Sequence, residues 1–427
     1  EEMAAWLRVN PTIDSTVEQT QALAYVSGDM FDMPAGSVPM VFGVEYRKDA
    51  IDLQTDEGSQ YGGITFNLIP SFEADYDVWE AFTEAAFPLT DSLDLEISAR
   101  VADYSPSGID TVFSYTGGLI WEPADGYRLR ANYARAQRAP TLAELYSPPR
   151  GDYDSINDIC ADTTATSTNR GHDNCRLEPG IAATIAEFGI FEDENNGYGP
   201  SAGNPDVFEE TADTYTIGIS IAPGWAGNLR LAVDYWDISI DDKITEISNS
   251  EIMKQCYDSS QPWGPDNPFC NEISRHEDDG QIYQIMNRQY NLDSGKTRGV
   301  DVAMDYVFDM SRGDLTFKLD WTHMLEDSDT YKGLDGLVTV DYTGQLSAQN
   351  FDDRATASLT WRYEGWRIRW STKYKSSIVD DFERLEEWNE FMADNDADCA
   401  SGDDDCVTNP EPLAYYKFPS YMTHDIS

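Results

Sequence analysis

Few residues of this sequence combine the side-chain types and the spacing that bond-making chemistry requires. The four histidines are scattered, which disfavours a metalloenzyme site; they are His172, His276, His323 and His424. The short patterns of serine hydrolases, zinc proteases, nucleoside triphosphatases and dinucleotide-binding enzymes do not occur in a suitable context. We therefore expect a protein that is not an enzyme.

The densest cluster of ionisable residues is acidic. Residues 380–411 contain thirteen carboxylates and one base, Arg384. The spacing that opens a calcium-binding loop occurs in this stretch at Asp394, Asp396 and Asp398. Ca²⁺ in the 394–405 loop is therefore the one cofactor that the residues suggest. The alternative is a solvated charge run, because Cys399 replaces the turn glycine and the distal glutamate is absent.

The six cysteines fall into three pairs that are close in sequence, each within a polar, turn-rich stretch. The pairs are Cys160 with Cys175, Cys256 with Cys270, and Cys399 with Cys406. Metal ligation is disfavoured because no C-x-x-C pattern accompanies them, and free surface thiols are the remaining alternative. The clustering favours three disulfides that staple loops, in an oxidising compartment.

Composition narrows the class of protein. Among 427 residues, 29 Lys and Arg face 78 Asp and Glu, which gives a net charge of −49 and excludes binding to nucleic acid through its phosphates. Mean hydropathy is −0.51 and no apolar stretch approaches the roughly 18 residues of a spanning helix. Aromatic residues make up 12% of the chain, which is too many for a disordered acidic polypeptide. A folded, aromatic and very acidic protein remains.

Strict alternation of apolar and polar residues is the strongest pattern in the chain. Residues 315–325, for example, place Leu319 and Trp321 on one face and Lys318 and Asp320 on the other, as a β-strand would. About thirteen segments of this kind are predicted, at 17–31, 39–52, 78–89, 92–104, 111–122, 127–138, 213–222, 229–246, 300–308, 315–325, 355–363, 366–374 and 420–427.

The connections between these segments alternate between short and long. The long ones are predicted at 53–77, 140–212, 247–290, 326–352 and 380–419. An up-and-down antiparallel meander with two different ends fits a transmembrane β-barrel, whose short turns face the periplasm and whose long loops face outward. A soluble propeller or sandwich is the alternative, but no repeat of 40–50 residues is found. An odd number of strands implies a partial barrel.

Two of the long loops contain aromatic residues that could stack on sugar rings. These candidate ligand-binding residues are Tyr153, Tyr198, Tyr257, Trp263 and Phe269. The alternative is that they pack the loops themselves around the disulfides.

Two short motifs resemble those of a known family, the TonB-dependent outer-membrane receptors. The first is an Arg138-Ala139-Pro140 turn at the end of a predicted strand, with Glu144 following it. The second is Asn204-Pro205-Asp206, which is similar to the companion segment before the next descending strand. Residues 235–238 and the paired cysteines look most like the Xanthomonas-, Caulobacter- and Alteromonas-type branch, whose members are often linked to carbohydrate uptake.

The resemblance implies a 22-stranded barrel filled by a plug, of which residues 1–427 would be the central and later part. The plug domain, the TonB box and the final strands would lie outside this sequence. The implied location is the outer membrane of a Gram-negative bacterium, in contact with lipid and lipopolysaccharide. The implied partners are TonB-ExbB-ExbD, contacted through the missing N-terminal region, and a small-molecule or oligosaccharide ligand.

The function predicted from this resemblance is TonB-dependent active import of a scarce, bulky solute that the extracellular loops capture, with an oligosaccharide favoured. A ferric-siderophore or haem receptor of the same family is the alternative, with His172 as the one candidate haem ligand. A secreted β-rich carbohydrate-binding protein is the alternative from a different class.

Overall fold

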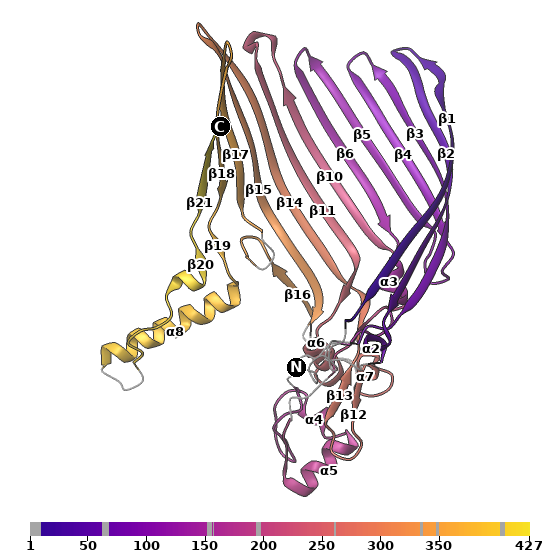
Figure 1. Ribbon diagram of the computed structural model, residues 1–427, viewed down its shortest axis with the longest axis vertical. Coiled ribbons are helices and arrows are strands. Elements are labelled where there is room, and N and C mark those ends of the chain that lie inside the picture. The colour runs from indigo at the N-terminus through magenta and orange to yellow at the C-terminus, as the bar shows by residue number, and fades with distance from the viewer. Residues whose placement is uncertain are drawn as a thin grey trace.

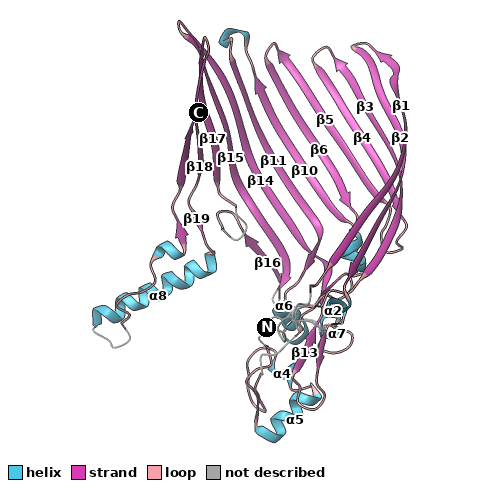
Figure 2. Ribbon diagram, in the orientation of Figure 1, coloured by secondary structure: helices cyan, strands magenta, loops and turns pink. Residues whose placement is uncertain are grey.

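The computed structural model describes residues 10–61, 68–151, 156, 158–193, 198–259, 262–333, 336–346, 350–401 and 406–427. Within these residues, thirteen strands follow one another in chain order across a single antiparallel sheet (Figures 1 and 2). They are β1 (Ile13–Met33), β2 (Gly36–Thr55), β3 (Phe72–Thr90), β4 (Leu93–Tyr104), β5 (Val112–Ala124), β6 (Tyr127–Arg138), β10 (Glu210–Ile221), β11 (Leu229–Glu246), β14 (Asn287–Met310), β15 (Gly313–Gly333), β17 (Asp353–Tyr363), β18 (Trp366–Lys375) and β21 (Tyr421–Ile426). The predicted all-β meander is confirmed.

The sheet is a curved wall with β1 and β21 at its two edges (Figure 1). Several strands are much longer than those of ordinary globular proteins: β1 has 21 residues and β14 has 24. At roughly 3.4 Å per residue, such strands exceed the roughly 30 Å hydrocarbon core of a bilayer even when tilted. The sheet therefore has enough height to cross a membrane and to continue beyond it.

The strand register gives the sheet one apolar and one polar face. Leu319 lies opposite Met304 on β14 and Ala357 on β17, whereas Lys318 lies opposite Asp305 and Ser358. Residues directly opposite each other in antiparallel strands share a face, so the alternation within each strand adds up across the sheet. The predicted two-faced pattern is confirmed.

The apolar face is open rather than packed against a second layer. Ile217 is 63% exposed and Trp79 is 62% exposed, although both are large apolar side chains at the middle of their strands. Among the described residues, no second sheet or helical layer covers this face. Such a surface is suited to lipid, and it is incompatible with the buried core of a sandwich.

The polar face is crossed by ion pairs between strands. Arg130 on β6 reaches over β10 to Asp234 on β11, with its Nε 2.9 Å from Asp234 Oδ1. Gly218 of β10 lies between them in the register, and a Cβ there would be 1.9 Å from the Asp234 oxygen. The absence of a side chain at Gly218 therefore allows this pair to form.

Short turns join the strands at one end of the sheet and long connections join them at the other (Figure 1). Most of the shorter elements belong to the long connections, and η1 belongs to a turn. They are α2 (Glu57–Gln60), α3 (Leu142–Tyr146), β7 (Thr163–Thr164), α4 (His172–Cys175), α5 (Pro179–Phe188), β8 (Ile190–Phe191), β9 (Ser201–Ala202), η1 (Gly224–Ala226), α6 (Asn249–Tyr257), α7 (Pro268–Asn271), β12 (Ile273–Arg275), β13 (Ile282–Ile285), β16 (Gly336–Asp341), β19 (Ile378–Val379), α8 (Phe382–Ser401), η2 (Leu413–Tyr415) and β20 (Lys417–Phe418). In the described part of the chain, no helix is both long and apolar enough to cross a membrane.

Candidate functional site

The rim of the sheet at the loop end is built from the two motifs that the sequence singled out. The Arg138 guanidinium, at the end of β6, donates to both carboxylate oxygens of Glu144 at 2.9 and 3.1 Å and to Glu210 at 2.6 Å. Thr141 caps α3, and the Glu144 side chain accepts from the Thr141 backbone N–H in return. Ala139 and Pro140 form the link between strand and helix.

The second motif joins the same rim. The Asn204 backbone N–H donates to the Glu144 carbonyl at 2.7 Å, and its side-chain amide donates to the Gln289 carbonyl at 2.9 Å. The Asn204 side-chain oxygen accepts from the Asp206 N–H, which closes the turn around Pro205. The structure therefore brings these motif residues together as a brace between β6, β10 and β14.

Hydrogen bonds and ion pairing keep the Glu144 carboxylate of this brace ionised. Partial burial acts to raise the pKa of the Glu144 carboxyl, but the hydrogen bonds from Arg138 and from the Thr141 N–H outweigh burial and keep the pKa below its usual range. Glu144 thus stays ionised and bound to Arg138 at neutral pH.

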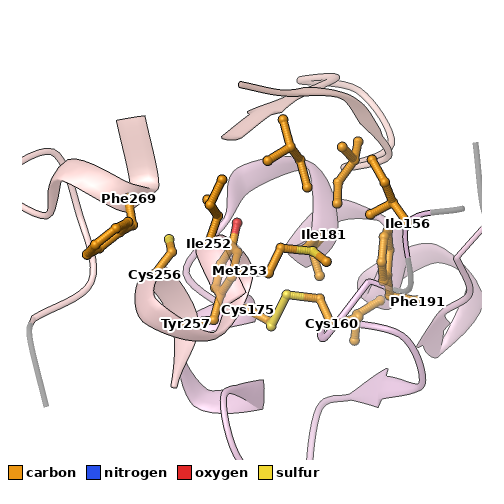
Figure 3. Close-up of a cluster of buried hydrophobic side chains, with 13 residues drawn as sticks. Ile156, Cys160, Cys175, Ile181, Phe191, Ile252, Met253, Cys256, Tyr257 and Phe269 are labelled. Atoms are coloured by element: carbon orange, nitrogen blue, oxygen red, sulfur yellow. A yellow bond between two sulfur atoms is a disulfide. The ribbon is translucent and has the colours of Figure 1, made fainter. Parts of the chain in front are cut away.

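Two long connections pack against each other as one unit, the loop subdomain, formed by the described residues of 156–193 and 247–285. Its apolar core draws on both loops (Figure 3) and consists of Ile156, Cys160, Cys175, Ile181, Ile185, Phe191, Ile252, Met253, Cys256, Tyr257, Phe269, Ile282 and Ile285. The disulfide Cys160–Cys175 belongs to this core, and Cys256–Cys270 joins α6 to α7 beside it. Cys399–Cys406 forms a third disulfide elsewhere. All three predicted disulfides are confirmed.

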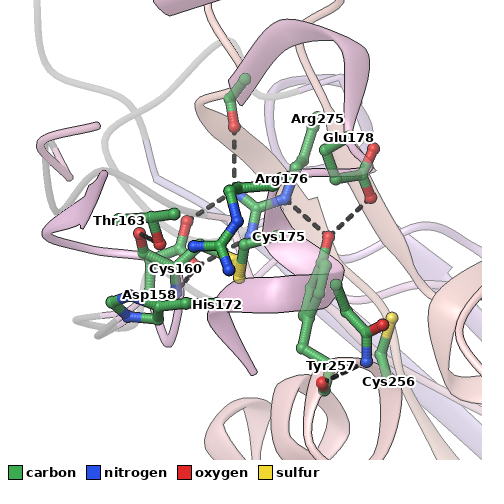
Figure 4. Close-up of a disulfide and its surroundings, with 12 residues drawn as sticks. Asp158, Cys160, Thr163, His172, Cys175, Arg176, Glu178, Cys256, Tyr257 and Arg275 are labelled. Carbon is green, nitrogen blue, oxygen red and sulfur yellow. Dashed lines mark hydrogen bonds and ion pairs between the residues drawn. A yellow bond between two sulfur atoms is a disulfide. The ribbon is translucent and has the colours of Figure 1, made fainter. Parts of the chain in front are cut away.

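A buried polar network also links the two halves of the loop subdomain (Figure 4). Arg275 on β12 donates to Asp158 at 2.8 Å and to the Tyr257 hydroxyl at 2.9 Å. The Tyr257 hydroxyl donates to Glu178 at 2.7 Å. The side chains of Asp158 and Arg275 are 0% and 6% exposed, so this is a true interior ion pair that spans 117 residues of sequence. The loop subdomain is consequently held together by its own interior.

The predicted ligand-binding aromatic residues are mostly part of this interior. Tyr257 is 1% exposed and Phe269 is 6% exposed, so these two rings are enclosed and do not face a ligand. Trp263 is partly buried against the same core, and a ligand role for it stays a prediction. Tyr198 is half-buried and its carbonyl accepts from the Ile285 N–H. Tyr153 lies outside the described residues.

His172 is also removed from solvent. It is 2% exposed, and its Nδ1 lies 2.8 Å from the Ser167 hydroxyl. A haem ligand must reach its iron, so coordination by His172 would require the loop subdomain to open.

The expected calcium loop is a helix. Asp394 and Asp396 lie exposed in α8. An α-helix turns by about 100° per residue, so the side chains of residues two apart point to nearly opposite sides of the helix. Asp398 belongs to the same helix, but its side chain lies outside the described residues. The prediction of a loop here is wrong because the helical backbone does not curl these carboxylates around a common point. Among the described residues no cluster of three metal-ligating side chains is found, and calcium binding stays a prediction.

A groove that the sequence reasoning missed lies along α8. Trp388, Phe391 and Tyr416 contribute rings to it, and its volume is about 560 Å³. The spacing of Leu385, Trp388 and Phe391, three residues apart, is the signal that could have revealed an amphipathic helix here.

The geometry defines an outer-membrane-type β-barrel wall with elaborate loops at one end. The family described as "TonB dependent receptor-like, beta-barrel" matches residues 5–427. The chain therefore belongs to the TonB-dependent receptor-like β-barrel family, and the protein is a β-barrel protein of the Gram-negative outer membrane. This excludes the secreted carbohydrate-binding protein. The long loops are accordingly extracellular.

Solved structures show the same fold. The ferric enterobactin receptor PfeA from Pseudomonas aeruginosa has a TM-score of 0.57 at 13% identity, over 96% of this chain and 46% of that chain. The siderophore receptor PirA from Acinetobacter baumannii has a TM-score of 0.55 at 14% identity, over 96% of this chain and 48% of that chain. The FrpB iron transporter from Neisseria meningitidis has a TM-score of 0.51 at 13% identity, over 96% of this chain and 48% of that chain. The chain thus spans about half the length of these receptors. Among curated proteins, none matches.

Proposed function

We propose that the protein takes part in TonB-dependent active import across the outer membrane, and that its ligand is a bulky, electrically neutral solute, an oligosaccharide ahead of a ferric chelate. Family membership supports the transport role, with TonB-ExbB-ExbD as the energy-coupling partner. The loop end would capture the ligand, and no residue need make or break a bond.

The observation that carries the choice of ligand is the charge of the loop end. Residues 380–411 contain thirteen carboxylates and one base, in a chain whose net charge is −49. Charges of one sign repel an anionic ligand within a screening length of roughly 8 Å at physiological salt. A neutral, hydroxyl-rich solute escapes this repulsion, whereas an anionic ferric chelate does not.

The polar face of the sheet suits the same solute. Thr356 lies exposed on the lumen side of β17, and paired charges such as Arg130 with Asp234 lie farther along the wall. Hydroxyl groups and satisfied ion pairs offer exchangeable hydrogen bonds to sugar hydroxyls without a strong net field. The rim brace at Arg138 and the loop subdomain would keep the mouth in a fixed shape above this wall.

A ferric chelate remains the competing ligand, because the proteins with similar solved structures are named as siderophore receptors and iron transporters. At 13–14% identity the similarity establishes the fold alone. His172 offers no accessible ligand to haem iron, because its ring is buried.

Uptake by cells tests this proposal. The source bacterium and a strain that lacks the full-length receptor gene would be given fluorescent neutral oligosaccharides or ⁵⁵Fe-loaded chelates, each with and without a protonophore. We expect the deletion to abolish protonophore-sensitive uptake of at least one oligosaccharide and to leave chelate uptake unchanged. Loss of chelate uptake alone would overturn the choice of ligand.

A further inference from the structure

The groove on α8 lies on a separate extension, the α8 arm, formed by the described residues of 380–418. In Figure 1 the arm projects from the loop end beside β18 and β21, away from the loop subdomain. The return segment after α8 runs back along the helix, so that Trp388 and Phe391 face Val407 and Pro410 across the groove. The groove is therefore exposed on the cell surface.

The far end of the groove is fixed. The disulfide Cys399–Cys406 joins the end of α8 to the return segment. Just before it, the buried Asn395 side chain accepts from the Val407 N–H at 2.6 Å and donates to the Val407 carbonyl at 3.2 Å. This double hydrogen bond substitutes for a backbone pair and holds the two walls together.

The near end of the groove is fixed as well. The Asp380 N–H donates to the Tyr416 carbonyl at 2.8 Å, and β19 pairs with β20 next to it. The Trp388 indole N–H donates to the Glu411 carbonyl at 2.8 Å, which sets the orientation of the ring. A groove whose walls are linked at both ends and whose main ring is fixed binds with little loss of side-chain entropy.

We propose that this groove binds a neutral sugar ring of an oligosaccharide. The inference rests on the proposed function and names the place where its ligand first binds. The apolar C–H face of a pyranose matches an aromatic ring, and Phe391 is 44% exposed beside the half-buried Trp388. The volume of about 560 Å³ suits one or two sugar rings.

The polar lining favours hydroxyl groups over charged ones. Glu387 and Glu411 present carboxylate acceptors and Asn409 presents both a donor and an acceptor, which together match the mixed demands of sugar hydroxyls. The two carboxylates oppose an anion. Arg384 lies over the Tyr416 ring at 5.5 Å and therefore already occupies the aromatic face that a cationic ligand would seek.

Binding by the full-length receptor in detergent tests this inference. The probes are neutral malto-, cello-, xylo- and laminari-hexaose, followed by calorimetry. We expect one of them to bind the wild type, Trp388→Ala to weaken its binding about tenfold or more, and Phe391→Ala to weaken it severalfold. Trp225→Ala is the matched control, because Trp225 is 81% exposed but lies in η1 at the opposite end of the barrel, and it should bind as the wild type does.

The outcomes separate this inference from the proposed function. If a hexaose binds equally well to the wild type, Trp388→Ala and Phe391→Ala, the groove is overturned while oligosaccharide import stands. Trp388-dependent binding of a cationic peptide, with no sugar bound, would overturn the class of ligand. Phe391→Ala keeps the test valid if Trp388→Ala fails to fold, because Phe391 is 44% exposed, whereas the Trp388 ring is half-buried and hydrogen-bonded to the return segment. Heat-modifiable gel mobility reports the folding of each variant.

Discussion

The loop subdomain and the α8 arm both lie at the extracellular end, and both combine a disulfide with aromatic side chains, yet they use them differently. In the loop subdomain the rings and sulfurs are enclosed, with Tyr257 1% exposed and Cys160 fully buried. In the arm the disulfide Cys399–Cys406 closes one end of a hairpin and Phe391 stays open to solvent. Aromatic content alone therefore does not indicate a binding site, and the proposal for the arm rests instead on rings left exposed in a braced groove.

The two regions also differ in what stabilises them. The loop subdomain has a shared core and an interior ion pair, so its two loops depend on each other. The arm has few buried side chains and relies on short-range links such as Asn395 with Val407. We therefore expect damage to the subdomain to change its stability, and damage to the arm to change ligand capture.

The largest expected effect comes from Arg275→Ala. It leaves Asp158 charged and buried without its partner, which should destabilise the loop subdomain by about 3–5 kcal/mol. Hydrogen exchange of the full-length receptor should show faster exchange across both loops and unchanged exchange in the sheet.

The matched control for Arg275→Ala is Arg170→Ala. Arg170 pairs with Asp258 at 3.0 Å but its side chain is 56% exposed, so its loss should change stability by less than about 1 kcal/mol. Equal effects of the two variants would contradict the idea that the interior pair holds the subdomain together.

Removal of single disulfides should have the next largest effect. Cys160→Ser with Cys175→Ser opens a link across 15 residues and should destabilise the subdomain by about 3 kcal/mol. Cys399→Ser with Cys406→Ser opens a link across only seven residues, for which the same relation gives about 2 kcal/mol. Proteolysis should nevertheless reach the arm first, because it has no shared core to keep its walls together. Faster cleavage in the subdomain would reverse this order.

Alkaline pH should affect the loop subdomain by a smaller amount. Burial, chiefly, and the nearby Glu178 raise the pKa of the Tyr257 hydroxyl above its ordinary value of 10, although Arg275 acts in the opposite direction. A raised pKa means that the folded state favours the protonated phenol, so this stabilisation is complete below pH 10 and is lost as pH rises through the folded value.

Hydrogen exchange of the subdomain, corrected for the intrinsic rate, should therefore increase above pH 10 in the wild type and show a weaker pH dependence in Tyr257→Phe. A pH dependence that survives unchanged in Tyr257→Phe would assign the effect to another group.

The sequence predicts the sheet far better than it predicts the loop end. Alternation at positions such as Leu319 and Lys318 is a local property that survives folding, so strands and their faces follow from it directly. The pairing of Asp158 with Arg275 joins residues 117 positions apart, and no local pattern encodes it. The prediction that Tyr257 faces a ligand failed for the same reason. Its residue type and its position in a loop do not reveal that a loop distant in sequence covers the ring.

The smallest expected effect concerns the acidic helix. The local sequence does contain a helix signal, because strong helix formers such as Glu386 and Met392 accompany the spacing of Trp388 and Phe391. The calcium-type spacing of the aspartates was given more weight than this helix signal. Asp394→Asn with Asp396→Asn should change stability by less than about 0.5 kcal/mol, since both side chains are exposed on α8. Thermal unfolding in 5 mM CaCl₂ would show a calcium-dependent rise, lost in the double variant, if these carboxylates do bind the ion. A curve that is the same with calcium and with EDTA would leave the helix as a solvated surface whose charge acts only by repelling anionic ligands.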